Sequence, residues 1–239
     1  QTLTAIAEQK AGIFKKGCSA VIGPLPEEAR LVCDQRAAAL GLDFYEYGKD
    51  FSFSNSSFKN GDLLLSHVVL GLQGAYQEEN AALALQAFLL FMKQRGWEID
   101  FSVLPSSLRE THWAGRLEEI SPGIYLDGAH NLPALTRLVE FIKEQKGKKC
   151  NLLFGALKRK DYSGMLAYLQ ETLPEVQVTV TSFSYGESVG QGEAADFEYV
   201  ADYREFIESF KREQAADQLL FITGSLYFIA EVRAYLYRV

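Results

Sequence analysis

The segment Ile124–Asn131, with the sequence IYLDGAHN, combines side chains that could do chemistry. Three apolar residues run directly into Asp127, and His130 and Asn131 follow closely. Asp127 could accept hydrogen bonds from a ribose or orient a cation, and His130 could donate to a carboxylate or shuttle a proton. Taken alone, the segment is explained more simply as a strand-to-helix turn, because Asp and Asn are common turn residues and Asn131 suits a helix N-cap.

Two more polar segments follow apolar runs in the second half of the chain. The first, FGALKRKD, contains Lys158–Lys160, and the second, TGSLYF, contains Ser225 and Tyr227. Ser225 and Tyr227 could bind an anion at the beginning of a helix. The simpler explanations are a solvated turn for the lysines and a plain helix N-cap for Ser225.

Two basic residues elsewhere are candidates for binding an anion or a cofactor. Arg116, in HWAGRLE, could place its planar guanidinium on a phosphate, whereas an ion pair with Glu118 or Glu119 is an equally good explanation. Lys10, in EQKAG, lies at the end of an expected helix. A solvated basic face is the simpler explanation for Lys10, because the C-termini of helices attract Lys.

The pattern of elements changes near the middle of the chain. Before residue 98 it predicts three helices, two short strands and a hairpin at Asn60-Gly61, and Glu98–Arg116 reads as a short helix and a connection. After it, strands and helices alternate, which predicts an α/β fold with a mostly parallel sheet. The carboxyl ends of such strands share one edge, so the three polar segments should lie together, with Ser184–Glu193 as a flexible, solvated loop. The expected helices are 3–11, 26–40, 78–95, 133–146, 162–173, 202–214 and 226–238, and the expected strands are 19–23, 43–47, 124–126, 151–154, 176–182 and 219–223.

The composition narrows the possible functions. The chain has 239 residues, of which 48% are hydrophobic and 23% charged, as in an ordinary soluble globular protein. Its net charge of −7 argues against sequence-independent binding of nucleic acid, which needs clustered Lys and Arg. The three cysteines have no metal-like spacing and fit a reducing, cytoplasmic compartment, and no membrane span or signal peptide is apparent. A phosphate loop, a zinc motif and a Gly-x-Ser-x-Gly elbow are all missing from the sequence.

Six motifs, taken together and in order, resemble folylpolyglutamate synthase and dihydrofolate synthase, within the wider Mur ligase superfamily. They span nearly the whole chain, so the resemblance is specific. The motifs are IAEQKAGIFKKG (6–17), YQEENAALAL (76–85), WAGRLE (113–118), LDGAHN (126–131), FGALKRKDY (154–162) and TGSLYFIAEVR (223–233).

The resemblance implies a division of the chain and a reaction. Residues 1–103 would be the C-terminal portion of an ATP-binding domain, 104–118 a linker, and 119–239 a Rossmann-like ligase domain. The family's phosphate loop and magnesium-binding residues would lie upstream, so we expect these 239 residues alone to be inactive. The family's reaction transfers the γ-phosphate of ATP to a carboxylate, and the amine of L-glutamate then displaces phosphate from the acyl phosphate.

The resemblance also assigns roles to residues on both sides of the expected linker. Lys10 matches a lysine that is carbamylated and thereby becomes an oxygen ligand for Mg²⁺. Asn80, Arg116 and Asp127 match residues that bind ATP.

His130 and Ser225 match catalytic positions near the glutamate and the acyl phosphate. The family usually has Pro directly after AHN, whereas this chain has Leu132-Pro133, which shifts the start of the helix and the direction in which His130 points.

Two alternatives stay open at this point. One is a Mur-type ligase that joins an amino acid to a UDP-linked cell-wall precursor, and the other is a binding module for nucleotide or folate that has no catalytic activity. In the favoured interpretation the partners are ATP, L-glutamate and dihydropteroate or a folate. We expect no nucleic acid, no membrane and a monomer.

Overall fold

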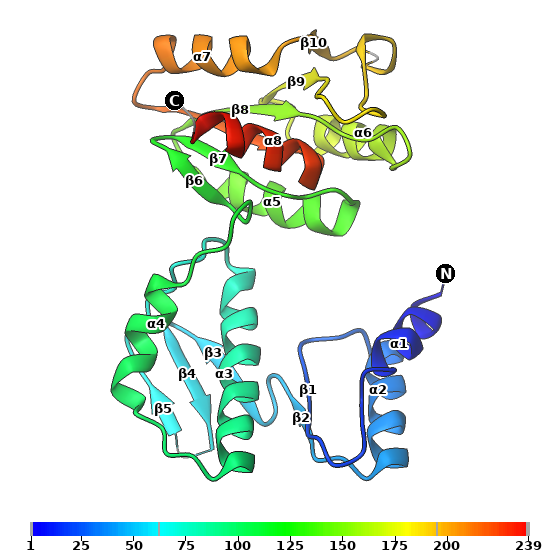
Figure 1. The fold of residues 1–239 in the computed structure, drawn as a ribbon, viewed down its shortest axis with the longest axis vertical. Helices are drawn as coiled ribbons and strands as arrows, with labels where there is room; N and C mark the ends of the chain where they lie inside the picture. Colours follow the sequence, from blue (N-terminus) through cyan, green and yellow to red (C-terminus); the bar gives the residue numbers. More distant parts are fainter. Residues whose placement is uncertain (1, 62, 195, 238–239) are drawn as a thin grey trace. The chain divides into compact units, whose positions relative to one another are not determined.

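The computed structural model describes residues 2–61, 63–194 and 196–237 (Figure 1). The chain divides into two compact units, each of which is described by itself. The first unit contains the residues up to Gly71 together with Ala75–Thr111, and the second contains Leu72–Gly74 together with the residues from His112 onward. The chain passes from one unit to the other after Thr111, inside the segment 104–118 that was expected to be a linker. Much of that segment forms a helix of the first unit, and Leu104 is buried in its core.

The first unit combines helices with two small sheets. One sheet is a parallel pair of strands, and the other has three antiparallel strands. Within the described residues, its elements are α1 (Leu3–Ala11), β1 (Ala20–Ile22), α2 (Glu27–Leu40), β2 (Phe44–Glu46), β3 (Phe51–Ser54), β4 (Ser57–Asn60), β5 (Leu63–Leu65), α3 (Tyr76–Arg95), η1 (Phe101–Val103) and α4 (Leu104–Glu110).

Local signals account for the helix ends in this unit. Helix α2 begins after Pro26 and ends at Gly41, and α3 ends at Gly96. Both glycines have positive φ angles, 64° and 68°, which suit glycine because it lacks a Cβ atom. The predicted helices 3–11, 26–40 and 78–95 are therefore confirmed to within two residues at each end.

The antiparallel sheet contains one predicted turn and one that the sequence did not reveal. Strands β4 and β5 pair so that Asn60 lies opposite Leu63, which confirms the hairpin at Asn60-Gly61. Strands β3 and β4 are joined by Asn55 and Ser56, whose φ angles are 50° and 56°. This second turn was missed because Ser is not a typical residue for positive φ. The sheet buries phenylalanine side chains, among them Phe58, against Ala82 and Leu85 of α3.

The second unit is a six-stranded sheet with helices on both faces. The strand order is β10-β9-β8-β11-β7-β6, and all neighbours are parallel except β6 and β7. This confirms the predicted α/β fold with a mostly parallel sheet. Its elements are β6 (Glu118–Ser121), β7 (Ile124–Leu126), α5 (Leu132–Glu144), β8 (Lys149–Phe154), α6 (Tyr162–Thr172), β9 (Gln177–Thr181), η2 (Gln191–Glu193), β10 (Glu198–Val200), α7 (Tyr203–Glu213), β11 (Gln218–Thr223) and α8 (Leu226–Leu236).

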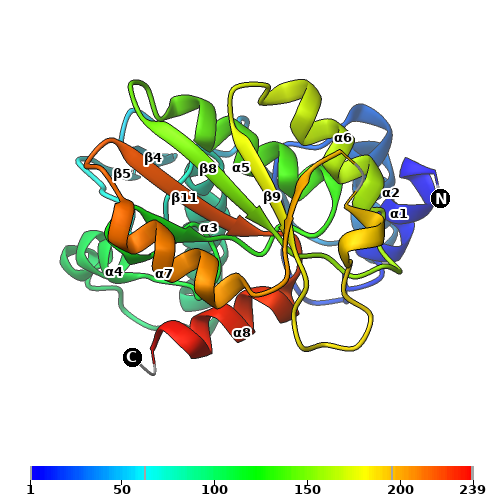
Figure 2. The same ribbon diagram turned by 90° about the horizontal axis from the view of Figure 1, so that it is seen from above.

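The two faces of this sheet are covered by different helices (Figure 2). On one face, Ile207 of α7 and Phe228 of α8 pack with Leu126 and Ile222 in one buried cluster. On the other, Phe141 of α5 contacts the rings of Tyr125 and Phe221, with ring centroids 5.9 and 6.1 Å away. Successive strand residues point to opposite faces, so both helical layers bury the same strands.

Two edge strands of this unit were not predicted. Strand β6 has the sequence EEIS and β10 has EYV, which are short and lack an apolar alternation. They occupy the two outer positions of the sheet. Pairing with an existing strand stabilises such segments, so their own composition gives little indication of them.

The loop Ser184–Glu193 is packed, which corrects the expectation of a flexible, solvated loop. The N–H of Val189 donates to the Ala156 oxygen at 2.9 Å, and the N–H of Lys158 donates to the Glu187 oxygen at 2.8 Å. Val189 is fully buried, and Glu193 forms an ion pair with Lys158 at 2.6 Å. The loop is therefore held against the exit of β8 at several points.

Across the described residues, every helix is too short or too polar to serve as a membrane span.

Candidate active site at the carboxyl edge of the sheet

The exits of β7, β11 and β8 meet at one edge, as predicted. The N–H of Gly224 donates to the Ala129 oxygen at 3.0 Å, and the N–H of Gly155 donates to the Thr223 oxygen at 2.9 Å. The N–H of Asp127 donates to the Ile222 oxygen at 3.0 Å. These bonds continue the strand pairing beyond the strands, so the three polar segments form one continuous surface.

Glycines permit this close approach. Gly224 has a φ of 114°, and a Cβ atom added there would lie 2.7 Å from the Gly155 oxygen. A Cβ atom on Gly155 would lie 2.6 Å from Cδ1 of Phe228. Side chains at these positions would collide with backbone or with a buried ring, so the edge requires glycine at both.

Asp127 is buried and joins two turns. Its Oδ2 accepts from the N–H of Leu117 at 3.1 Å and its Oδ1 accepts from the N–H of Ala129 at 2.9 Å. Burial raises the pKa of Asp127, although the two amides and the nearby Arg116 and His130 side chains oppose the rise. The carboxylate thus acts as a connector in this structure, which supports the turn-forming explanation, and its predicted contact with a nucleotide stays a prediction.

The turn that carries Arg116 is locked against this connector. Gly115, with a φ of 68°, donates its N–H to Glu118 Oε2 at 2.8 Å, and its oxygen accepts from the N–H of Gly128 at 2.8 Å. Leu117 has a φ of 45°, unusual for a residue with a side chain, and is fixed by its bond to Asp127. The backbone on both sides of Arg116 is therefore held in one conformation.

The Arg116 side chain is exposed, and in the part of the chain that the structure describes it forms no hydrogen bond or ion pair. Glu118 instead accepts from Nε of Arg233 at 3.0 Å, and Glu119 accepts from the N–H of Gly123 at 2.9 Å. The alternative explanation for Arg116, an ion pair with Glu118 or Glu119, is therefore wrong. A guanidinium without a partner beside a rigid turn is suited to bind an anion.

His130 contacts the backbone through one ring nitrogen. Its Nδ1 lies 2.8 Å from the oxygen of Gly128, and a carbonyl oxygen can only accept, so Nδ1 is the donor in this contact. In the neutral ring, Nε2 then carries the lone pair that can accept a proton. Asn131 caps α5 through a bond from the N–H of Ala134 at 3.0 Å, and the helix begins at Leu132, one residue before the predicted start.

Ser225 is the N-cap of α8. Tyr227, two residues later in the same motif, is positioned by ring stacking. The hydroxyl of Ser225 accepts from the N–H of Tyr227 at 3.3 Å and is buried. The Tyr227 ring stacks on Tyr185, with centroids 4.2 Å apart, and both rings are about half exposed. The capping explanation for Ser225 fits this geometry, and its catalytic role stays a prediction.

The two remaining predicted residues lie in the first unit. Lys10 is exposed in the last turn of α1. Asn80 is exposed on α3 and donates from Nδ2 to Oε1 of Gln77 at 2.9 Å. The described residues contain no group of three or more His, Cys, Asp or Glu side chains placed to hold a metal ion. We derive no reaction step from a magnesium ion.

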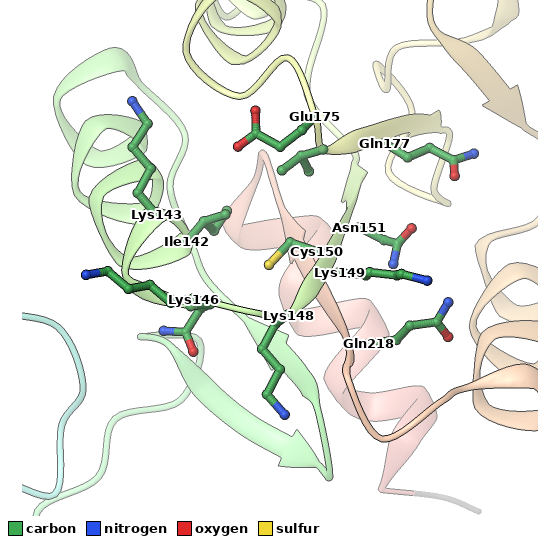
Figure 3. A pocket seen from close by; sticks show the side chains of 12 residues that line it. Ile142, Lys143, Lys146, Lys148, Lys149, Cys150, Asn151, Glu175, Gln177 and Gln218 are labelled. Carbon is green, nitrogen blue, oxygen red and sulfur yellow. The ribbon is translucent and has the colours of Figure 1, made fainter.

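The opposite, amino edge of the sheet has a pocket of about 610 Å³, which contains none of the predicted site residues. Four lysines line it, together with Glu175 and amide side chains. Figure 3 shows that the lysines point in different directions, with Lys143 and Lys146 on one side and Lys149 on the other. These ammonium groups do not converge on one point, so the pocket is not an organised anion site. The lysines are Lys143, Lys146, Lys148 and Lys149.

Comparison with known proteins identifies relatives along nearly the whole chain. Residues 115–226 match the family model described as Mur ligase, glutamate ligase domain. The chain is 31% identical to a folylpolyglutamate synthase from Lacticaseibacillus casei, over 97% of this chain and 57% of that protein. It is 29% identical to a dihydrofolate synthase/folylpolyglutamate synthase from Bacillus subtilis, over 97% of this chain and 58% of that protein.

The fold is similar to that of solved structures of the same enzymes. A folylpolyglutamate synthase in complex with AMPPCP and folate matches with a TM-score of 0.82 and 29% identity, covering 99% of this chain and 57% of that one. The chain thus spans little more than half the length of the relatives that it matches.

Proposed function

We propose that this chain, which is a homologue of folylpolyglutamate and dihydrofolate synthases, belongs to an ATP-dependent amide-forming ligase. Its residues 115–226 match the glutamate ligase domain of the Mur ligase family. The proposed reaction joins L-glutamate to dihydropteroate or to a folate. The observation that carries the proposal within the site is the free guanidinium of Arg116, on a rigid turn beside His130, in the segment that matches the family model.

The reaction has two steps. A carboxylate oxygen of the acceptor attacks the γ-phosphorus of ATP, the bond to the β-phosphate oxygen breaks, and ADP leaves. The nitrogen of glutamate then attacks the acyl carbon, the carbon–oxygen bond to phosphate breaks, and inorganic phosphate leaves while the nitrogen loses a proton. Both steps concentrate negative charge on phosphoryl and acyl oxygens, so fixed positive charge and positioning lower the barrier.

Residues of the second unit fit these needs. Arg116 can bind phosphoryl oxygens through two parallel N–H groups, since no carboxylate of the described chain pairs with it. His130 can accept a proton from the attacking nitrogen at Nε2, because Nδ1 donates to Gly128. Asp127 holds the two turns that carry Arg116 and His130, and we assign Ser225 to the same edge as a group near the acyl phosphate.

In this proposal the first unit supplies residues that bind the nucleotide and its metal ion. Asn80 would contact ATP, and Lys10 would supply a magnesium ligand after carbamylation, which converts its ammonium into a carboxylate-like group. Both side chains are exposed, which leaves them accessible for these roles. When bound, Mg²⁺ would neutralise charge on the phosphates.

The proposal also covers the setting of the enzyme. We place it in the cytoplasm as a monomer that acts on small molecules. Support comes from the three cysteines, Cys18, Cys33 and Cys150, all of which are free thiols, as expected in a reducing compartment.

The test is turnover by the full-length gene product. ADP release and incorporation of labelled glutamate are measured with ATP and Mg²⁺, using dihydropteroate and tetrahydrofolate as separate acceptors. We expect glutamate-dependent ADP release with at least one of them. Ligation to a UDP-linked cell-wall precursor instead would indicate a Mur-type ligase, and binding of ATP or folate without turnover of any acceptor would indicate a binding module. Either result overturns the proposal.

A further inference from the structure

Within the described residues the Arg116 side chain forms no hydrogen bond or ion pair, although two carboxylates follow it closely in the sequence and the Asp127 carboxylate is near enough to feel its charge. Glu118 and Glu119 are the nearest acidic residues along the chain, and a guanidinium so placed would ordinarily pair with one of them. Such a pair would neutralise the charge that a phosphate needs. The arrangement that prevents it is therefore part of how the site works.

Arg233 of α8 holds Glu118. Its Nε lies 3.0 Å from Oε1 and 3.1 Å from Oε2 of that carboxylate. The pair also contacts the N–H of Gly115, which donates to Oε2 at 2.8 Å, and Tyr237. The Arg233 guanidinium lies over the Tyr237 ring at 4.5 Å, and the Tyr237 hydroxyl lies 3.4 Å from both Glu118 Oε1 and Arg233 Nη2. Side-chain exposure is 17% for Glu118 and 38% for Arg233, so the pair is partly shielded from water.

Glu119 is held in a second way. It accepts from the N–H of Gly123 at 2.9 Å and interacts with the hydroxyl of Tyr125, on the strand that pairs with β6. With both carboxylates engaged, Arg116 retains its charge for a ligand. Residues 115 and 233 also become linked, because the N–H of Gly115 and Nε of Arg233 share one carboxylate.

We propose that Arg233 is a positioning residue for the phosphate-binding arginine: by binding Glu118 it keeps that carboxylate away from Arg116 and fixes the turn that presents Arg116. The inference rests on the proposed function for its ligand, the phosphates of a nucleotide. The role that it assigns to Arg233 requires no contact between Arg233 and substrate.

The first experiment is a double-mutant cycle in the full-length gene product. Arg233→Met releases Glu118, which then pairs with Arg116, so we expect KM for ATP to rise about tenfold while kcat changes less. In the double variant Glu118→Gln/Arg233→Met the competing charge is absent, and most of the loss should be recovered. Arg233→Lys keeps the charge and should be intermediate.

A matched control is Lys211→Met, which breaks the partly buried pair between Lys211 and Glu208 on α7. It should leave KM for ATP unchanged. If the double variant is as impaired as Arg233→Met, Arg233 supports only the fold and the proposal is overturned.

A second measurement does not depend on turnover. Phenylglyoxal modifies accessible, unpaired guanidinium groups, and mass spectrometry of peptides can follow Arg116 separately. We expect rapid labelling of Arg116 in the wild type, at least threefold slower labelling in Arg233→Met, and rapid labelling again in the double variant. Equal labelling in all three overturns the inference. The expected labelling pattern in a protein that ligates none of the acceptors would overturn the proposed function alone.

Discussion

The carboxyl and amino edges of the six-stranded sheet carry their polar side chains in two different ways. At the amino edge four lysines line one pocket and point apart. At the carboxyl edge several charged groups are fixed by hydrogen bonds, with Asp127 joined to two amides and Glu118 joined to an amide and to Arg233. The four lysines of the amino edge are therefore the less organised set.

This difference teaches that the number of charges does not make a site. A flexible ammonium group in water loses side-chain entropy when it binds an anion, and it gains little in high dielectric. A guanidinium on a rigid turn, whose neighbouring carboxylates are held by other groups, loses less entropy on binding because much of the ordering has taken place during folding. The following predictions test that contrast, from the largest expected effect to the smallest.

Replacing a glycine by alanine should destabilise the protein strongly at the carboxyl edge and weakly at the amino edge. Gly224→Ala places a Cβ atom against the Gly155 oxygen at a positive φ, so we expect the free energy of unfolding to fall by about 4 kcal/mol. Gly147 also has a positive φ but has open space around it, and Gly147→Ala should cost about 1 kcal/mol. Urea denaturation of the full chain, followed by a probe in the second unit, measures both. Equal losses would contradict the contrast.

Asp127→Ala should lower the free energy of unfolding of the second unit by about 3 kcal/mol. The N–H groups of Leu117 and Ala129 then lose their acceptor inside the protein. Asp161→Ala is the matched control, since Asp161 caps α6 with an exposed carboxylate, and its loss should cost about 1 kcal/mol. The same urea titration compares the two variants. A smaller effect at Asp127 than at Asp161 would count against its role as connector.

Arg116→Ala should lower kcat/KM for ATP in the full-length gene product about 100-fold, or about 2.7 kcal/mol, because a fixed charge on the phosphates is lost. Lys146→Ala, at the amino edge, should change the same ratio less than twofold, about 0.4 kcal/mol. Steady-state ADP release measures both. A larger effect for Lys146 would move the anion site to the opposite edge.

The smallest effect concerns pH. Burial raises the pKa of Asp127 above its ordinary 3.8, so the folded state holds this proton more tightly than the unfolded state. The stability that Asp127 contributes by this tighter proton binding is complete below the ordinary pKa, and it is lost as pH rises through the raised pKa of the folded state. The stability of the wild type relative to Asp127→Asn should therefore decrease as pH rises from about 3 to 7. Urea titrations at several pH values measure this difference, and a difference that increased with pH would refute the sign.

Local chemistry made much of the fold predictable. Gly41 and Gly96 end helices because they accept a positive φ, and Pro26 precedes the helix that it was expected to open. The alternation after residue 119 predicted a parallel sheet because apolar runs of strand length were separated by helical patterns. The exits of β7, β8 and β11 could be placed on one edge for the same reason.

Other features depended on contacts between distant residues. Strands β6 and β10 are recognisable only beside the strands with which they pair. The loop from Ser184 to Glu193 has the composition of a solvated loop, yet it is held by Ala156 and Lys158. Composition describes how a segment behaves alone, whereas burial against a neighbour can reverse it.

By itself the sequence determined which chemical groups are present, the order of most strands and helices, and the motifs that resemble folate-linked ligases. It left open whether Arg116 was a free cation or half of an ordinary surface pair. The tertiary structure decided this, because the partner of Glu118 is Arg233, 115 residues further along the chain. A ligand can use only those charged side chains that are not already paired within the folded protein. Which side chains pair depends on their distances in space, and short stretches of sequence do not specify these distances.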